Sequence, residues 1–159
     1  MKWRSFHRSP AADMRIEVLS YPFDPWEELR RHQALIDAGR GAFGACASFV
    51  GTLRDSNEGT AVHAMRLEHY PGMTDKYLHA IAEEVGQRWS ILDLIILHRV
   101  GELQPGDPIV LTAVWSAHRA AAFAACQYLV EELKSRAPFW KKETLAQGER
   151  WVEHNTPGQ

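Results

Sequence analysis

Residues 116–143 read SAHRAAAFAACQYLVEELKSRAPFWKKE, and this stretch decides how the chain can fold. An apolar run that ends at Trp115 precedes it, which predicts a strand leading into a helix. Ser116 is a suitable N-cap, so His118 and Arg119 are predicted in the first helical turn. A helix N-terminus favours negative charge, yet this turn carries two basic side chains. We therefore expect a bound anion, such as phosphate or carboxylate, at this junction.

The helix is predicted to end near Ala137, because Pro138 disfavours helical geometry in the residue before it. Lys134 then lies in the last turn, and a turn at Pro138 can bring Lys141 back towards it. Neighbouring positive charges lower the pKa of a lysine, which suits nucleophilic or acid–base chemistry. The alternative is an ordinary cationic helix C-terminus followed by solvated lysines. The predicted apolar stripe of the helix is Phe123, Cys126, Leu129, Val130 and Leu133.

The chain of 159 residues is long enough for one domain with its own core. Residues 15–154 are predicted to form that domain, residues 1–14 a disordered extension and residues 155–159 a polar tail. The formal net charge of −2 argues against general affinity for nucleic acid. No stretch approaches the roughly 20 apolar residues of a membrane span. Cys46 and Cys126 are interpreted as reduced core residues of a cytoplasmic protein, not as a disulfide or a metal site.

Alternation and apolar runs predict a mixed α/β (α+β) fold. The expected strands are 15–19, 42–53, 62–68, 91–100, 108–115, 139–144 and 149–153, and the expected helices are 24–38, 74–89 and 117–137. Strand 62–68 is expected to pair with strand 42–53 across the polar loop 54–59. Gly44 and Gly51 are expected to mark bulges or a close approach of two backbones.

Basic side chains are predicted to converge from three parts of the chain. Arg54 comes from the polar loop, His118 and Arg119 from the helix start, and Lys134 and Lys141 from around the broken helix end. This set suits a small anionic ligand, because helix N–H groups and arginine bind phosphate well. A lone loop arginine is otherwise most often a solvated residue. The residues alone therefore predict a phosphorylated or carboxylated ligand and a reactive lysine.

Other polar residues give weaker signals. The histidines His63, His69 and His79 do not have the spacing of a metal-ligand set, so no metal site is predicted. His98 and Arg99 end an apolar strand and either face the same region as the basic residues or have structural roles. We favour the structural roles.

Several strings in this chain together resemble the signature of the large, catalytic subunit of molybdopterin synthase. They are GTLRDSNEG at 51–59, LEHYPGM at 67–73, HRVGELQPGD at 98–107, SAHR at 116–119 and KSRAPFWKKE at 134–143. The likeness covers roughly residues 15–154, with the strings in the right order and at compatible spacing.

The resemblance implies an α/β hammerhead-like fold with an additional antiparallel sheet. It also implies an enzyme, a sulfurtransferase of molybdenum cofactor biosynthesis that converts cyclic pyranopterin monophosphate (precursor Z) into molybdopterin. The sulfur arrives as a thiocarboxylate on the C-terminal Gly-Gly of a small ubiquitin-like partner subunit. A cytoplasmic homodimer within a heterotetramer is implied, with no metal or cofactor of its own and no nucleic-acid or membrane partner.

The site residues implied by the resemblance follow from matching positions. Lys134 and Lys141 match the catalytic lysines, and Thr52 stands where some relatives carry a basic residue. The implied substrate-binding set is Thr52, Leu53, Arg54, His118, Arg119, Lys134, Lys141, Lys142 and Glu143. The competing hypothesis is a non-catalytic module that binds an anionic small ligand or the C-terminal tail of a partner.

Overall fold

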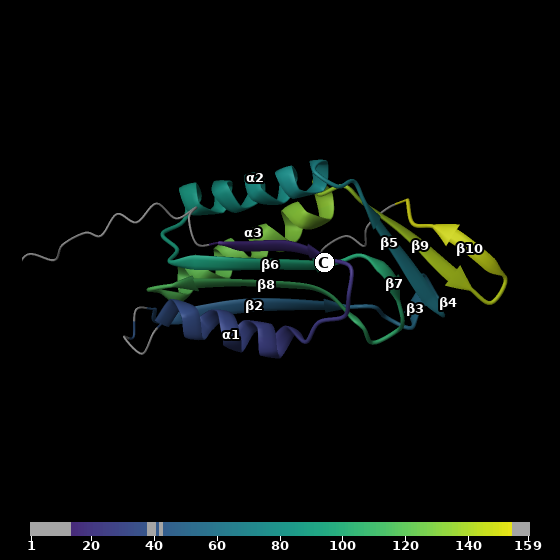
Figure 1. Ribbon diagram of the computed structural model, residues 1–159, viewed down its shortest axis with the longest axis horizontal. Coiled ribbons are helices and arrows are strands. Elements are labelled where there is room, and N and C mark those ends of the chain that lie inside the picture. The colour runs from purple at the N-terminus through teal and green to yellow at the C-terminus, as the bar shows by residue number, and fades with distance from the viewer. Residues whose placement is uncertain (1–13, 38–40, 42, 154–159) are drawn as a thin grey trace, which may run out of the picture.

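The computed structural model describes residues 14–37, 41 and 43–153 of the chain. Its main sheet consists, in spatial order, of β1 (Arg15–Leu19), β6 (Asp93–Arg99), β8 (Pro108–Ser116) and β2 (Ala45–Thr52) (Figure 1). β1 lies parallel to β6, whereas the β6–β8 and β8–β2 pairs are antiparallel.

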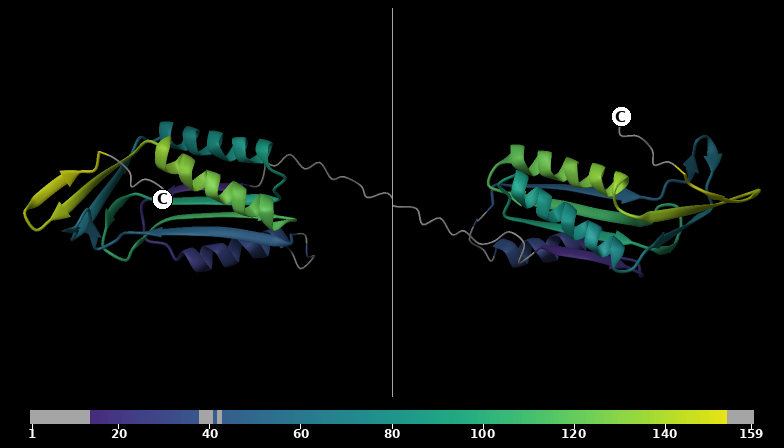
Figure 2. Two further views of the ribbon diagram at one scale, coloured as in Figure 1. Left: turned by 180° about the vertical axis from the view of Figure 1, so that it is seen from behind. Right: turned by 90° about the horizontal axis from the view of Figure 1, so that it is seen from above.

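Helices cover both faces of the main sheet (Figures 1 and 2). On one face lies α1 (Pro25–Asp37), whose Leu29 packs against a buried cluster that contains Trp115. On the other face lie α2 (Met73–Arg88) and α3 (Arg119–Ser135), over a larger buried cluster. Because both faces are covered, all seven residues of β6 are buried, which explains why that strand reads as a continuous apolar run.

A second, antiparallel sheet lies beyond one end of the main sheet (Figure 1). Its spatial order is β10 (Gly148–Trp151), β9 (Phe139–Leu145), β5 (Ala64–His69) and β7 (Gly101–Leu103). A third buried cluster, which includes Met65, Leu67 and Leu103, packs against Val18 and Ile109 of the main sheet. The predicted mixed α/β fold with an additional antiparallel sheet is therefore confirmed.

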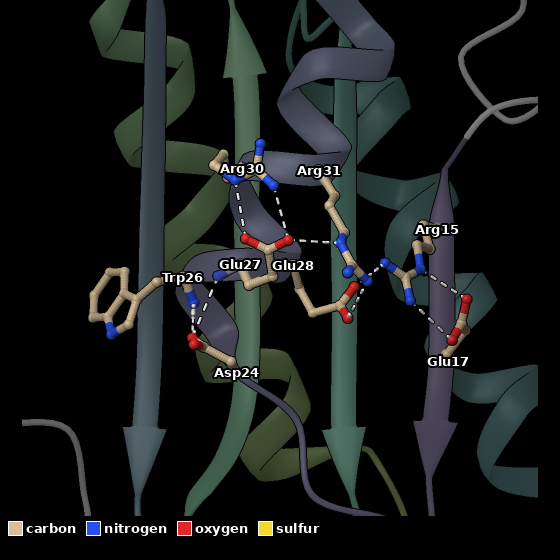
Figure 3. A network of polar contacts seen from close by, with 8 residues as sticks. All are labelled: Arg15, Glu17, Asp24, Trp26, Glu27, Glu28, Arg30 and Arg31. Atoms are coloured by element: carbon tan, nitrogen blue, oxygen red, sulfur yellow. Dashed lines mark hydrogen bonds and ion pairs between the residues drawn. The ribbon is translucent and has the colours of Figure 1, made fainter.

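Polar contacts connect α1 to β1 (Figure 3). Asp24 caps the helix, because its Oδ1 accepts hydrogen bonds from the backbone N–H groups of Trp26 and Glu27 at 2.9 and 3.3 Å. Arg15 of β1 donates to Glu17 on the same strand and to Glu28 on the helix. Such partly exposed ion pairs contribute little to stability. The apolar underside of α1 therefore makes the larger contribution to its docking.

Two glycines lie where backbones or side chains approach closely, as predicted. A Cβ atom at Gly44 would lie 2.4 Å from the carbonyl oxygen of Ala117, just before α3 begins. A Cβ atom at Gly51 would lie 2.9 Å from Cγ1 of Val110 on the neighbouring strand. The β2–β8 register shifts between Gly51 and Thr52, which marks a bulge at the end of β2.

The predicted pairing of strand 62–68 with strand 42–53 is wrong. β5 pairs with β7 and β9 in the second sheet. The reason lies in the connection, which is not a simple polar loop but a small hairpin of β3 (Ser56–Asn57) and β4 (Thr60–Ala61). The N–H of Val62 donates to the carbonyl of Asp55 at 2.8 Å, closing this hairpin and directing the chain away from β2.

The start of α3 also differs from the prediction. The helix begins at Arg119 with His118 as the cap residue, and Ser116 is the last residue of β8. The Ser116 hydroxyl donates to the carbonyl of Ser90 at 3.0 Å and accepts from the N–H of His118 at 3.3 Å. Its contact with Ser90 holds Ser116 in the sheet, and the helix therefore starts later.

Two side chains expected in the core are exposed instead. Phe123 of α3 is 67% exposed. Cys46 is also exposed on β2, whereas Cys126 is buried. The expected extension and tail lie outside the described residues, apart from Met14, which packs against the larger core cluster. Among the described helices, none is long and apolar enough to cross a membrane.

Substituting Gly44→Ala is expected to destabilise the fold by about 1–3 kcal/mol, because the added methyl overlaps a backbone carbonyl. Urea or thermal unfolding measures this change. Ser48→Ala, an exposed position on β2 close to Gly44 in the chain, is the control and should shift stability by less than about 0.5 kcal/mol. Equal stability of the two variants would contradict the close approach at Gly44.

Candidate functional site

A cavity of about 320 Å³ lies between the end of α3, the end of β2 and the start of β9. This volume suits a small organic ligand. Much of its wall is aliphatic or aromatic. The polar side chains on the wall are Thr52, Arg54, His98, Lys134 and Lys141. The cavity therefore combines an apolar surface with a concentration of basic groups.

Three separate elements deliver the charged side chains. Lys134 lies in the last turn of α3, and Arg54 follows the bulged end of β2. Lys141 lies on β9, where Phe139 and Glu143 share its face and pair with inward-facing residues of β5. The predicted alternation of β9 is confirmed, and it directs Lys141 towards the cavity.

The chain reversal at Pro138 brings the two lysines to one cavity. The buried Thr74 of α2 donates from its hydroxyl to the carbonyl of Pro138 at 3.1 Å. Arg136, directly after α3, donates two hydrogen bonds to Glu84 of α2 at 2.7 and 2.9 Å. Both contacts tie the reversal to α2, so β9 is set at a fixed angle to the end of α3.

Charge and burial act together on Lys141. Burial lowers the pKa of Lys141 below its ordinary value, and the positive charge of Lys134 lowers it further. Glu143 acts in the opposite direction. A lysine whose pKa is lowered gives up its proton more readily, which suits a role in proton transfer. The charge of Lys134 thus acts on Lys141 in the predicted direction.

A smaller hollow of about 140 Å³ adjoins the cavity and shares Thr52, Arg54 and Lys141 with it. Leu53 and Glu143, both from the predicted set, line this second hollow. Lys141 therefore lies on the wall of both hollows.

Glu143 is held on both carboxylate oxygens. Its Oε1 accepts a hydrogen bond from Asn57 at 2.8 Å, and its Oε2 accepts two from Arg150 at 3.0 and 2.7 Å. Glu143 itself is only 4% exposed. It therefore connects β9 to β10 and to the β3–β4 hairpin, and it supplies a negative charge close to Lys141.

Lys142 lies on the opposite face of β9 from Lys141. Its Nζ forms an ion pair with Glu149 and lies 5.6 Å from the ring centroid of Trp151. Lys142 lines neither of the two hollows.

The anion site expected at the helix start is separate from the lysine cavity. His118 and Arg119 are exposed at the first turn of α3, and Lys134 lies in its last turn. At about 1.5 Å per residue the helix rises about 22 Å from Arg119 to Lys134. Of the predicted basic set, only Arg54, Lys134 and Lys141 come together within one chain. His118 and Arg119 lie at the far end of α3 from the cavity.

Sequence reasoning missed one polar residue of the cavity. The structural role favoured for Arg99 is confirmed, since it donates to Asp107 at 3.2 Å and to the carbonyl of Glu102 at 2.9 Å. His98 lines the cavity instead, with its ring stacked on Phe139 at 3.7 Å and 11°. The two residues are neighbours on a strand, so their side chains point to opposite faces. This alternation could have indicated that only one of them faces the cavity.

The apolar wall was not predicted as part of a site. It is formed by Phe49, Ile109, Val110, Val130, Leu133 and Phe139. These residues come from four elements and give no local signal of a shared cavity. Among residues 14–37, 41 and 43–153, no group of three His, Cys, Asp or Glu side chains is placed to hold a metal ion.

Comparison with known proteins gives one consistent family. Residues 22–136 match the family described as "MoaE protein". The chain is 54% identical over 140 residues to the molybdopterin synthase catalytic subunit of Pseudomonas aeruginosa, covering 88% of this chain and 91% of that protein. It is 53% identical over 138 residues to the protein of the same name from Ralstonia nicotianae, covering 87% and 76% respectively.

Solved structures agree with these relatives. The molybdopterin biosynthesis MoaE protein of Burkholderia ambifaria has a TM-score of 0.73 and 46% identity, covering 91% of this chain and 92% of that one. A complex of subunits 1 and 2 of the molybdopterin-converting factor from Helicobacter pylori contains a chain with the same fold. Its TM-score is 0.73 at 18% identity, covering 89% of this chain and 92% of that one.

Substituting Glu143→Ala is expected to lower the free energy of unfolding by about 1–3 kcal/mol. It leaves Arg150 and Asn57 without their acceptor, although partial exposure of Arg150 reduces the cost below that of a fully buried pair. The control Glu149→Ala removes an exposed ion pair on the same hairpin and should cost less than about 0.5 kcal/mol. Urea unfolding compares the two, and an equal effect would contradict the anchoring role of Glu143.

Substituting Lys134→Met is expected to raise the pKa of Lys141 towards its ordinary value, because it removes a neighbouring positive charge. Titration of 15N-labelled lysine side chains by NMR measures this directly. Lys76→Met, an exposed position on α2, is the control and should leave the pKa of Lys141 unchanged. A pKa of Lys141 that does not respond to Lys134→Met would show that the two amines are not coupled.

Proposed function

The chain belongs to the MoaE protein family and functions as a molybdopterin synthase catalytic subunit in molybdenum cofactor biosynthesis, and we propose that its 320 Å³ cavity is where the pterin substrate is sulfurated. The observation that carries this proposal is the meeting of Arg54, Lys134 and Lys141 around one partly apolar hollow. The substrate, cyclic pyranopterin monophosphate, has a flat heterocycle for the apolar wall and an anionic phosphate for the basic groups.

We assign the catalytic role to Lys134 and Lys141. Their charges stabilise the anionic groups that develop as the thiocarboxylate attacks and the cyclic phosphate opens. The lowered pKa of Lys141 supports a role for its amine in proton transfer. Arg54 and Thr52 bind the substrate beside them, with Leu53 and Glu143 in the adjoining hollow.

The partner of this subunit is a small sulfur-carrier subunit, as the two-subunit complex among the related folds suggests. Its C-terminal Gly-Gly thiocarboxylate is narrow and negatively charged. Both properties suit the 140 Å³ hollow, which shares Arg54 and Lys141 with the larger cavity. We propose that the tail reaches Lys141 through this hollow while the pterin occupies the cavity.

His118 and Arg119 join the site only if a second copy of the chain supplies them, because α3 separates them from Lys134 in one subunit. The edge strand β2 supports such a dimer. Its eight residues, ACASFVGT, carry no charge, and β8 is its hydrogen-bonded neighbour in the sheet. Edge strands are commonly protected by charge, proline or a cover. An uncharged edge fits pairing with its own copy around a twofold axis.

Antiparallel pairing of two β2 strands would set the start of one beside the end of the other. At the start, Ala45 pairs with Ser116, two residues before His118. At the end, Thr52 lines the cavity together with Arg54. The partner's His118 and the partner's Arg119 would then approach this cavity and bind the substrate phosphate. We propose this homodimer as the centre of a heterotetramer with one small subunit at each end.

The proposed reaction uses the basic side chains of the chain itself, and we propose no resident metal or cofactor. The free thiols of Cys46 and Cys126 support a cytoplasmic location. The competing hypothesis of a non-catalytic module has less support, because the related proteins are named catalytic subunits.

The assay that tests this function supplies the homodimer with thiocarboxylated small subunit and cyclic pyranopterin monophosphate. Wild type is expected to form molybdopterin, and Lys134→Ala is expected to lower the rate at least about 100-fold. Lys76→Ala is the matched control and should retain wild-type turnover. Substrate binding without any product from the wild-type protein would favour the non-catalytic module.

Dimers that combine one Lys134→Ala chain with one Arg119→Ala chain test the shared cavity. Arg119→Ala alone is expected to weaken substrate binding by about 1–3 kcal/mol, as for a lost charged hydrogen bond. In the mixed dimer, isolated through two different tags, one of the two cavities keeps both residues. Turnover should return to about half of wild type. If the turnover of the mixed dimer is only the average of the turnover of its two parent homodimers, Lys134 and Arg119 of each site come from one chain.

A further inference from the structure

Among the described residues, His98 is the one imidazole on the wall of the cavity. It lies on β6 and is 8% exposed. Its Nδ1 lies 3.0 Å from the carbonyl oxygen of Arg99, and one face of its ring is covered by Phe139. With Nδ1 bonded and one ring face covered, Nε2 is the polar atom of His98 that is left to face the cavity.

The contact with Arg99 determines which ring nitrogen carries the proton. A carbonyl oxygen can only accept a hydrogen bond, so Nδ1 must be the N–H donor. Burial keeps the imidazole neutral at physiological pH by lowering its pKa to about 4. In a neutral imidazole with the proton on Nδ1, Nε2 is an acceptor.

This acceptor contrasts with the rest of the polar wall. Arg54, Lys134 and Lys141 carry donors and no acceptors. Among the side chains of the cavity, His98 and Thr52 can accept a hydrogen bond. A ligand that carries both an anionic group and N–H donors would therefore be bound in one orientation, with its anionic end towards the lysines and an N–H group towards His98.

We propose that His98 is a specificity-determining residue, whose Nε2 accepts a hydrogen bond from an N–H group of the substrate heterocycle while Arg54 and the two lysines hold the phosphate. The proposal rests on the proposed function and adds the orientation of the substrate. The site then distinguishes a pterin phosphate from other small phosphates by its ring.

Two variants separate the acceptor from the stacking contact. His98→Phe keeps a flat ring against Phe139 but removes both nitrogens. His98→Gln loses the ring but its side-chain oxygen reaches a position near that of Nε2. If the acceptor determines binding, the glutamine variant should perform better than the phenylalanine variant. If His98 only fills space, the order should be reversed.

The measurement is calorimetric titration of each homodimer with cyclic pyranopterin monophosphate and, separately, with inorganic pyrophosphate. His98→Phe is expected to weaken binding of the pterin about tenfold or more, as for a lost hydrogen bond in a buried site. Its affinity for pyrophosphate should stay within about twofold, which also shows that the cavity is intact. His98→Gln should bind the pterin within about threefold of wild type.

Equal losses for both ligands in His98→Phe, or unchanged binding of the pterin, would overturn the proposal. So would tighter pterin binding by His98→Phe than by His98→Gln. In steady-state assays His98→Phe should raise KM and leave kcat near wild type, because the contact is made to the bound substrate. Failure of the proposed function itself would show differently, as a wild-type complex that forms no molybdopterin.

Discussion

The chain reversal at Pro138 is the constraint on which the site depends. Without it, Lys134 and Lys141 would follow one another along a helix and meet no common cavity. The carbonyl of Pro138 accepts from the buried hydroxyl of Thr74, and Arg136 is tied to Glu84, so α2 fixes the reversal from outside the site. The second sheet continues this arrangement, because β9 pairs with β5 and directs Lys141 inward. The geometry of the cavity is thus set by a helix that contributes none of the described residues to the cavity wall.

In the cavity, basic side chains supply charge and apolar side chains supply the shape of the wall. Arg54 and the two lysines provide positive charge, and burial together with the charge of Lys134 lowers the pKa of Lys141. Apolar residues of β2, β8, α3 and β9 provide the surface on which a flat ring can lie. His98 contributes an imidazole that stacks on Phe139 of the apolar wall. The smaller hollow beside them shares Thr52, Arg54 and Lys141 with the cavity.

Local features of this fold were predictable from the sequence, and long-range ones were not. Asp24, Pro138 and the alternation of β9 act within a few residues. The start of α1, the end of α3 and the face of Lys141 were therefore predictable. The pairing of β5 depends on a hairpin at Ser56–Asn57 that has no strong signal, and that prediction failed. The basic residues matched one family, but the predicted helix 117–137 already separates Arg119 from Lys134 by about 22 Å, so their expected convergence within one chain was wrong. The exposure of Phe123 and the place of His98 likewise depend on tertiary packing.

The length of α3 has a consequence for how this chain can change. A helix turns by about 100° and rises about 1.5 Å for each residue, so removing one residue from its middle would swing Lys134 away from the cavity. Removing two full turns would nearly restore the direction of the side chain but bring the two helix ends about 10 Å closer together. The length of the helix therefore sets both the distance between its two ends and the direction in which Lys134 points. Insertions and deletions should be tolerated in the hairpin tips and excluded from this segment.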